Sequence, residues 1–374
     1  MSQHPDFTIP ADYLPRDGRL GSGPSLIRGE ALDSLATSGR GVLGTSHRQA
    51  PVKNLVGSIR SRLAEFYHLP GGFEVMLGVG GATSFWDAAV VSLIERKSQH
   101  VVCGEFSGKF AAATHAAPHL EVPSIIEVAP GQGGLPSTDP SVDAYCLIHN
   151  ETSTGVANEL GRPEGPGITL IDGTSAAGAM PIDLAATDIY YFSPQKALGS
   201  EGGLWLAICS PAGIERIEAT TRTDRWIPAS LSLKTALDNS RKNQTYNTPA
   251  ISTLWFLDQQ LGWMLERGGL TWATQRSLTS SGTLYNWAET HELITPFVAP
   301  EFRSPTVVTL DIDDRVNADD VVAVCRSNGI LDIGGYRKLG RNQLRIACFP
   351  GIEPTDIELT TKALDYVIER LAGI

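Results

Sequence analysis

Length, composition and charge already exclude several classes of protein. The chain has 374 residues, of which 42% are hydrophobic and 19% charged, a balance typical of soluble globular proteins rather than disordered or collagen-like chains. Its 41 acidic residues outnumber its 30 lysines and arginines, giving a formal net charge of −11, which disfavours nucleic acid and anionic membranes as partners. The sequence has no signal-peptide core and no apolar run of the about 18 residues that a membrane helix needs. We therefore expect a cytoplasmic protein.

The cysteines and histidines give no sign of a disulfide framework or a metal site. The five cysteines are scattered and none forms a C-x-x-C pair, which favours a reducing compartment with free thiols. His115 and His119 are spaced as metal ligands on a helix can be, but Pro118 would interrupt that helix. We therefore expect no bound metal.

The first two thirds of the chain combine one clear helix with a series of short apolar runs. Leu55, Ile59, Leu63 and Phe66 share one face of a predicted helix over 51–67. The apolar runs lie at 75–77, 101–103, 125–128, 144–148, 168–171, 189–192 and 204–209. Because each run is continuously apolar, we expect strands that are buried on both faces of a sheet. Helix-like segments separate them, and this alternation predicts an α/β fold with a largely parallel sheet.

The C-terminal third has a different pattern. Helices are predicted over 249–266, 270–292, 319–327 and 356–371, and strands over 306–312, 330–333 and 343–349. This tail has enough elements for a small core of its own. We place a boundary at Gly268-Gly269, so that residues 1–18 form an N-terminal arm, 19–267 a large domain and 268–374 a small α+β domain.

A glycine-rich turn over 78–84 follows the first strand and begins a helical stretch. Free backbone N–H groups at a helix N-terminus bind anions, and the hydroxyls of Thr83 and Ser84 add donors. The turn is not a dinucleotide-binding fingerprint, because Thr83 occupies the place of the third glycine. A tight strand–helix turn without a ligand is the alternative interpretation.

Two charged residues follow other buried strands. Asp172 lies at the carboxyl end of the 168–171 strand, where α/β sheets bind ligands. It can hold a cationic nitrogen, or it can simply cap the turn that follows. Lys196 comes just after the 189–192 strand and has no acidic neighbour before Glu201. A site of low dielectric would lower its pKa and suit a Schiff-base amine, whereas a surface lysine is the alternative.

The phosphate cradle, the carboxylate and the lysine are together the set that pyridoxal phosphate requires. The carboxylate keeps the pyridine nitrogen protonated, so that the ring can accept electrons, while the lysine holds the aldehyde and moves a proton. Asp172 and Lys196 are separated by one strand–helix–strand excursion, so we expect both at the same edge of the sheet.

The order and spacing of these segments resemble those of the class V aminotransferases of fold-type I, and within that class most of all the phosphoserine aminotransferases. The resemblance runs over nearly the whole chain and rests on segments 21–24, 46–48, 80–81, 150–152, 172–175, 195–196, 246–249 and 344–346. It implies a large domain with a mostly parallel seven-stranded sheet between helices, followed by a smaller C-terminal α+β domain.

The resemblance also implies roles for individual residues toward the cofactor. Lys196 would form the Schiff base with pyridoxal phosphate, Asp172 would face the pyridine nitrogen, Thr152 would bond the 3-oxygen and Phe106 would stack on the ring. The phosphate would be held by a larger set, in which the last two residues come from the other subunit of a homodimer: Gly81, Ala82, Thr83, Gln195, Asn247 and Thr248.

The substrates implied by the resemblance are small anionic amino acids and keto acids. Arg345 would bind the α-carboxylate, and His47, Arg48 and Arg337 would bind the distal anion. Ser22 and Tyr336 complete the expected substrate-binding set. The implied reaction moves the amino group between L-glutamate and 3-phosphohydroxypyruvate in serine biosynthesis, with a related step in pyridoxine biosynthesis.

The sequence departs from the family pattern in three places. Ala82 replaces an arginine of the phosphate cradle, Phe106 replaces a tryptophan on the cofactor ring, and Tyr336 replaces a histidine before Arg337.

Two other functions stay open. One is an alanine–glyoxylate or serine–pyruvate type of aminotransferase, and the other is a protein that binds a phosphorylated metabolite without catalysis. A desulfurase fits less well, because Gln195 precedes the lysine where that group has histidine.

Overall fold

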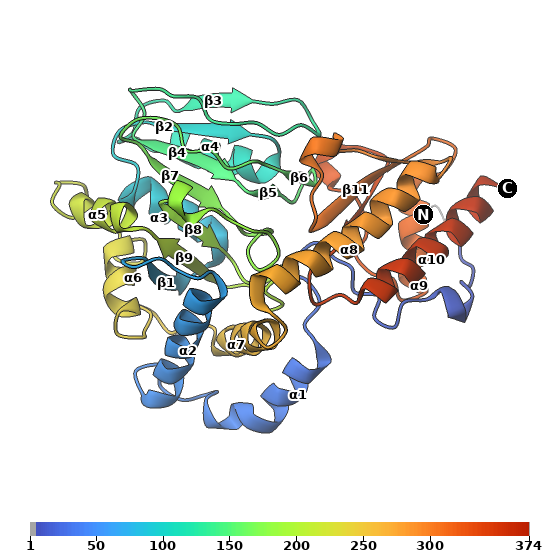
Figure 1. Cartoon of the computed structure of the whole chain (residues 1–374), viewed down its shortest axis with the longest axis horizontal. Coiled ribbons are helices and arrows are strands. Elements are labelled where there is room, and N and C mark those ends of the chain that lie inside the picture. Colours follow the sequence, from blue (N-terminus) through green and yellow to red (C-terminus); the bar gives the residue numbers. More distant parts are fainter. Residues whose placement is uncertain (1–4, 374) are drawn as a thin grey trace.

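The computed structural model describes residues 5–373, and a seven-stranded sheet forms its centre (Figure 1). The strand order is β1-β9-β8-β7-β4-β2-β3, and only β9 runs against its neighbours. The bounds are β1 Glu74–Val79, β2 Ser98–Val102, β3 Ser124–Glu127, β4 Ala144–Ile148, β7 Ile168–Asp172, β8 Ile189–Phe192 and β9 Leu204–Cys209. All seven predicted strands and the mostly parallel sheet are confirmed.

Helices cover both faces of this sheet, which explains why the strands are apolar at successive positions. One face packs against α2 (Ala50–Phe66) and α7 (Ile251–Leu265), and the other against α3 (Gly81–Ser92), α4 (Glu105–His115), α5 (Pro211–Thr220) and α6 (Leu233–Ser240). Along β8, Tyr190 and Phe192 enter the first core while Ile189 and Tyr191 enter the second. The helix α1 (Gly29–Ser38) packs on the outside of α7.

The expectation that every strand is buried on both faces is wrong for β3. Its residues alternate between partly buried and exposed, and Ile125 leaves 47% of its surface exposed. The strand lies at the edge of the sheet, beyond β2, where no helix covers its outer face (Figure 1).

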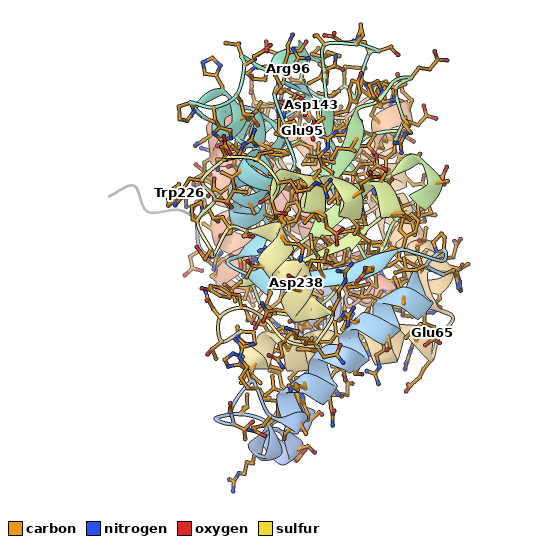
Figure 2. All side chains as sticks on the ribbon, turned by 90° about the vertical axis from the view of Figure 1, so that its left-hand side faces the viewer. Glu65, Glu95, Arg96, Asp143, Trp226 and Asp238 are labelled. Carbon is orange, nitrogen blue, oxygen red and sulfur yellow. The ribbon has the colours of Figure 1, made fainter. Side chains whose placement is uncertain are left out.

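At the end of the sheet where the parallel strands begin, a single carboxylate connects the segment before β2 with the start of β4. Asp143 accepts hydrogen bonds of 2.8 Å from the backbone N–H groups of Glu95, Arg96 and Lys97, which lead into β2. Figure 2 looks onto this side of the molecule, where Trp226 also projects from the loop after α5 and leaves 81% of its surface exposed. This end of the sheet lies opposite the carboxyl ends of β4, β7 and β8, where the cavity described below is found.

The C-terminal part of the chain forms a second layered unit. Three antiparallel strands, β10 (Ile294–Pro296), β11 (Val307–Ile312) and β12 (Gln343–Ala347), pack against α8 (Gly269–Thr290), α9 (Ala318–Ser327) and α10 (Pro354–Ala372). The strand β10 and a short hairpin of β5 (Asn150–Glu151) and β6 (Val156–Ala157) escaped prediction, because two or three residues carry too little periodicity.

The predicted strand over 330–333 is wrong. Asp332 has a φ of +62°, so the backbone cannot stay extended through this run. Ile330 and Ile333 are buried all the same, in a segment whose Leu331 exchanges backbone hydrogen bonds with Gly18 and Leu20 of the N-terminal segment. Ile9, Leu20 and Leu26 belong to the same core as the C-terminal helices. The described N-terminal segment therefore packs with the C-terminal helices (Figure 1).

None of the helices over residues 5–373 is long and apolar enough to cross a membrane. The division of the chain into domains at Gly268 stays a prediction. It coincides with the start of α8, where Gly268 itself has a φ of +112°.

Candidate active site

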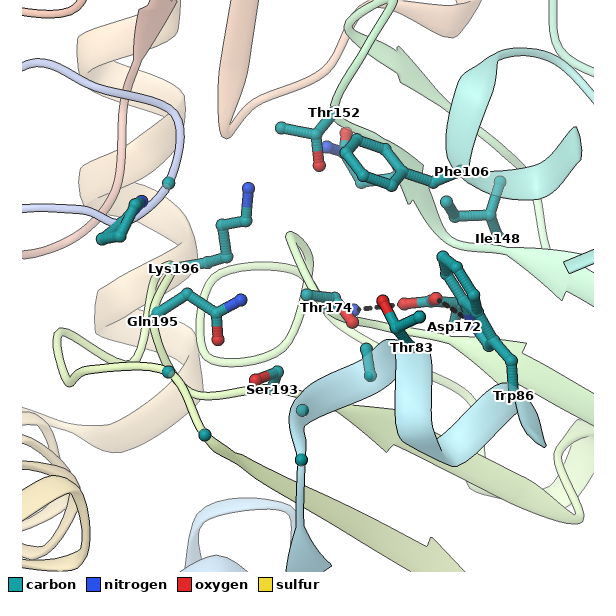
Figure 3. Close-up of a pocket in the computed structure, with 18 residues that line it drawn as sticks. Thr83, Trp86, Phe106, Ile148, Thr152, Asp172, Thr174, Ser193, Gln195 and Lys196 are labelled. Carbon is teal, nitrogen blue, oxygen red and sulfur yellow. Dashed lines mark hydrogen bonds between the residues drawn. The ribbon is translucent and has the colours of Figure 1, made fainter. Parts of the chain in front are cut away.

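A cavity of about 380 Å³ lies where the carboxyl ends of β4, β7 and β8 meet the N-terminus of α3 (Figure 3). Polar groups and the rings of Phe106 and Trp86 together line it, with Asp172 beside Trp86 and Thr152 beside Phe106 (Figure 3). Eight of the predicted site residues line it: Gly81, Ala82, Thr83, Phe106, Thr152, Asp172, Gln195 and Lys196. The structure thus brings together residues that lie more than a hundred positions apart in the sequence.

Lys196 reaches into the cavity from the loop after β8. Only 9% of its surface is exposed, and its Nζ donates a hydrogen bond to the backbone carbonyl of Ser22. A Cβ on Gly23 would lie 2.2 Å from this Nζ, so the close approach of the two segments requires glycine there. Burial lowers the pKa of Lys196 to about 7, with a further contribution from the nearby cation of Arg345. A large part of this amine is therefore uncharged and nucleophilic near neutral pH.

Asp172 is the last residue of β7 and faces Lys196 across the cavity (Figure 3). Its Oδ1 accepts a 2.8 Å hydrogen bond from the backbone N–H of Thr174, and its Oδ2 accepts a 3.1 Å bond from the indole N–H of Trp86. Burial raises the pKa of this carboxyl, and the two hydrogen bonds oppose that rise. The two interpretations of Asp172 are compatible, because it caps the turn after β7 and also lines the cavity.

The glycine-rich turn forms the floor of the cavity. Gly80 has a φ of +106° and precedes the first turn of α3, so that the unpaired N–H groups of this turn are available to an anion. A Cβ on Gly81 would meet no atom closer than the Ser193 hydroxyl at 3.6 Å, which leaves room for a ligand against the backbone. No arginine of the described chain lines the cavity, and Ala82 stands where the family pattern has one.

Unsatisfied polar atoms show that the cavity suits a polar ligand. Among the described residues, Gln195 Oε1, Thr174 Oγ1 and Asn150 Oδ1 are buried without a hydrogen-bond partner, and all three residues line the cavity. Buried polar atoms are nearly always paired in folded proteins. The donor-rich turn, these free atoms, the carboxylate and the uncharged lysine therefore fit pyridoxal phosphate.

The backbone at Phe106 is held in place by Glu151, a residue to which the sequence analysis gave no role. Glu151 is fully buried, and its carboxylate accepts hydrogen bonds from the backbone N–H groups of Phe106 (3.3 Å) and Ser107 (2.9 Å) and from the Ser153 hydroxyl (2.6 Å). It thereby joins the β5–β6 hairpin to the N-terminus of α4. Its signal in the sequence was an acid between two predicted site positions.

The substrate-binding residues predicted in the C-terminal part lie beside the cavity rather than in its lining. Arg345 on β12 donates a 3.0 Å hydrogen bond from Nη1 to the carbonyl of Thr152, while its Nε is buried without a partner among the described residues. Its guanidinium lies 5.3 Å from the ring centre of Tyr336, which in turn packs edge-on against Phe106 at 6.0 Å. Arg337 is exposed at the start of a short 3-10 helix.

The remaining predicted residues form a separate cluster, here called the 47–248 cluster. His47 Nδ1 and Thr248 Oγ1 lie 3.2 Å apart, and Arg48 donates a 2.8 Å hydrogen bond to the carbonyl of Tyr246, beside Asn247. None of these residues lines the cavity of the same chain. Two groups that the sequence analysis treated separately are thus one structural unit, at the N-terminal ends of α2 and α7.

The α/β fold and the lining of the cavity agree with the expected fold-type I transferase. The sequence comparisons are more specific, because the profile of the family described as Aminotransferase class-V matches residues 31–337. The chain belongs to the class V aminotransferases, and pyridoxal phosphate is its cofactor.

Individual relatives agree with this assignment. The chain is 53% identical over 370 residues to a putative phosphoserine aminotransferase of Mycobacterium leprae, which covers 98% of both proteins. The crystal structure of a phosphoserine aminotransferase from Cytophaga hutchinsonii matches with a TM-score of 0.84 at 22% identity, covering 93% of this chain and 99% of that one. A phosphoserine aminotransferase with bound pyridoxal phosphate from Trichomonas vaginalis matches at 0.80 and 19% identity, covering 94% and 100%. These structural matches confirm the predicted fold.

Proposed function

We propose that the protein is a phosphoserine aminotransferase, which exchanges the amino group between L-glutamate and 3-phosphohydroxypyruvate to give 2-oxoglutarate and O-phospho-L-serine. The observation that carries this proposal is the 53% identity to a relative of that name over 98% of both chains. The cavity supports it, because Lys196 and Asp172 face each other there as a transaminase requires. The reaction would supply phosphoserine for serine biosynthesis.

The cofactor, when bound, supplies an electron sink for the bonds at the substrate's α-carbon. We propose that Lys196 Nζ would hold the cofactor and would move the proton at the substrate's α-carbon. A pKa of about 7 suits an amine that must both accept and donate a proton near neutral pH. Asp172 would hold the protonated ring nitrogen, since its carboxylate has oxygen lone pairs but no cation partner among the described residues.

The other residues would bind and orient. We propose that Gly81, Ala82 and Thr83 hold the phosphate through the N-terminus of α3, with Gln195 beside them, because these groups line one side of the cavity. Thr152 would bond the ring oxygen, and Phe106 would lie against the ring.

Arg345 has a free donor near Lys196, and we propose that it binds the substrate's α-carboxylate. Tyr336 would support that guanidinium through its ring face, and Ser22 would act through its carbonyl on Lys196 rather than on the substrate. Arg337, exposed beside this group, would reach the distal anion of the substrate.

A second part of the proposal is a homodimer with shared active sites. The 47–248 cluster carries Arg48, Asn247 and Thr248 on its exposed surface and does not line the cavity of its own chain. The cavity, in turn, lacks the cradle arginine. We therefore propose that the cluster enters the partner's cavity as one unit, so that His47 and Arg48 cross the interface together with Asn247 and Thr248.

The intracellular setting and the domain division are also proposals. All five cysteines are free and buried, which fits the cytoplasm. The sheet and the C-terminal elements have separate hydrophobic cores, which supports a large domain that ends near residue 267.

One spectrum and one assay test the proposed function. The purified protein should be yellow, and borohydride should bleach the colour by reducing the bond between Lys196 and the cofactor. Phosphoserine should be a far better amino donor to 2-oxoglutarate than alanine or serine. A colourless protein that binds phosphorylated metabolites would favour the non-catalytic alternative. A preference for alanine or serine would favour the alanine–glyoxylate or serine–pyruvate type.

A further inference from the structure

The two oxygens of the Asp172 carboxylate are held by two neutral donors of different kinds. Oδ1 accepts a backbone N–H, that of Thr174, whereas Oδ2 accepts a side-chain N–H, that of Trp86. Within residues 5–373, Asp172 takes part in no ion pair at 4.0 Å or less. The position of this carboxylate therefore depends on one side chain that the sequence analysis did not single out.

Trp86 is itself fixed in place. It lies on α3, one helical turn after Ala82, and only 5% of its surface is exposed. Its indole stacks on the ring of Phe110 from α4, with 6.1 Å between the centroids and an angle of 15°. Figure 3 shows the indole standing beside Asp172, on the side of the cavity opposite Lys196. The helix whose first turn faces the phosphate end of the cavity thus also supplies a donor at the carboxylate end.

The chemistry of Asp172 requires such donors. Burial raises the pKa of this carboxyl, and the neighbouring charge of Glu151 acts in the same direction. A carboxyl that becomes protonated can no longer attract a cationic ring nitrogen. The hydrogen bonds from Thr174 and Trp86 lower the pKa and so favour the charged form.

We propose that Trp86 is a positioning residue, whose indole N–H holds the Asp172 carboxylate as a fixed acceptor for the ring nitrogen of pyridoxal phosphate. The identity of the ligand rests on the proposed function. The contact between Trp86 and Asp172 does not, because it is present without any ligand. The role is argued from the contacts of Trp86 with Asp172 and Phe110 in this chain.

Trp205→Phe is the matched control for Trp86→Phe. Trp205 belongs to the same hydrophobic core, with 4% of its surface exposed, and it packs edge-on against Phe85. No hydrogen bond in the described part of the chain joins its indole to Asp172. Both substitutions remove an indole of similar burial, but only Trp86→Phe removes a donor from the carboxylate.

The first test uses the apoprotein and the pH dependence of its free energy of unfolding. The pKa of Asp172 is raised in the folded state, so its contribution to stability is present at low pH and is lost as the pH rises through the folded value. Trp86→Phe should raise that pKa further. Its loss of stability relative to wild type should therefore grow as the pH rises from below to above the folded pKa of Asp172, whereas the loss caused by Trp205→Phe should not change over the same pH series.

Other titratable groups surround Asp172, so the same comparison is made in an Asp172→Asn background. The groups that face it from neighbouring elements are His100, Cys146, Glu151, Tyr190, Tyr191 and Lys196. Burial keeps the pKa of His100 at about 3 and raises those of the cysteine and the tyrosines well above their ordinary values. If Trp86 acts through Asp172, its pH-dependent effect should disappear in Asp172→Asn. An unchanged pH dependence would overturn the proposal.

The second test measures the affinity of the apoprotein for pyridoxal phosphate by fluorescence titration. Loss of a hydrogen bond to a charged group typically weakens binding by about tenfold to a hundredfold. Trp86→Phe should cause a loss of this size in the wild-type background and almost none in Asp172→Asn. Equal losses in both backgrounds would assign Trp86 a packing role and overturn the proposal. If the wild type bound no pyridoxal phosphate, the proposed function would fail, and the pH experiment would still decide whether Trp86 controls Asp172.

Discussion

At the scale of single residues, the burial of Lys196 makes a prediction that needs no substrate. Its pKa falls from an ordinary 10.5 to about 7 in the folded protein, so the unfolded chain binds more protons between these values. The stability of the apoprotein should therefore rise with pH from about 7 to about 10.5. Lys196→Met should be more stable than wild type at pH 7, and this advantage should vanish toward pH 10.5. Chemical unfolding at several pH values measures it, and a pH-independent difference would contradict the burial argument.

The same substitution should abolish transamination, because a thioether can neither hold the cofactor nor carry a proton. We expect a loss of at least about a thousandfold in kcat, the scale that general acid–base catalysis spans. Circular dichroism should show an unchanged fold. Near wild-type turnover by a folded Lys196→Met protein would rule out the proposed site.

The arginines should separate substrates by their anionic groups. Every substrate carries an α-carboxylate, so Arg345→Gln should weaken all of them. Arg48→Gln should weaken phosphoserine and glutamate but leave alanine nearly unchanged, because alanine has no distal anion. Each loss should be about tenfold to a hundredfold in kcat/KM. Equal losses for alanine and phosphoserine in Arg48→Gln would refute the distal-anion role.

At the scale of elements, the junction between the β5–β6 hairpin and α4 depends on the Glu151 carboxylate. Glu151→Gln places an amide N–H₂ against backbone N–H groups, and leaving such buried donors unpaired costs about 1–3 kcal/mol. We expect a lower free energy of unfolding by that amount and a higher KM, because the backbone at Phe106 and at Ser153, next to Thr152, loses its support. The control is Glu105→Gln on α4. The Glu105 carboxylate is partly exposed, so this substitution should change stability little. Equal destabilisation by the two substitutions would contradict the role of Glu151.

Most elements could be predicted from the sequence, because strands covered on both faces are continuously apolar and amphipathic helices repeat every three to four residues. The run over 330–333 misled the prediction because Ile330 and Ile333 are buried where Leu331 pairs with a distant segment, which local composition does not reveal. Lys196 and Asp172 could be found because each follows a buried strand. Trp86 and Glu151 could not be assigned roles, since their contacts depend on helix–strand packing across long sequence separations.

At the scale of the whole molecule, the N-terminal segment and the C-terminal helices share one core. Ile9 and Leu20 pack among these helices, and the same segment continues to Ser22, whose backbone carbonyl accepts the hydrogen bond from Lys196. The C-terminal unit therefore reaches Lys196 by two routes. One is Arg345 on β12, whose charge acts on the lysine, and the other is the N-terminal segment that packs in the C-terminal core. Both substrate-binding and proton-transfer groups depend on this packing.

The shared active site is the property of the whole assembly that complementation can test. We mix two inactive variants, Lys196→Ala and a double variant in which Asn247 and Thr248 are both replaced by alanine. After subunit exchange, a mixed dimer contains one site with its own Lys196 and with intact 247–248 donors from the other subunit. Because half of the dimers are mixed and each has one complete site, about a quarter of wild-type activity should return.

The structure favours this outcome because Asn247 and Thr248 are exposed and lie outside the cavity of their own chain. A cavity without an arginine at Ala82 has only neutral donors of its own at the phosphate end, so it gains most from donors on a partner. Each variant mixed with itself is the control and should stay inactive. Labelled subunits would establish that exchange has taken place. Exchange without recovered activity, or full activity in a monomer, would show that each chain completes its own site and that the 47–248 cluster serves another purpose.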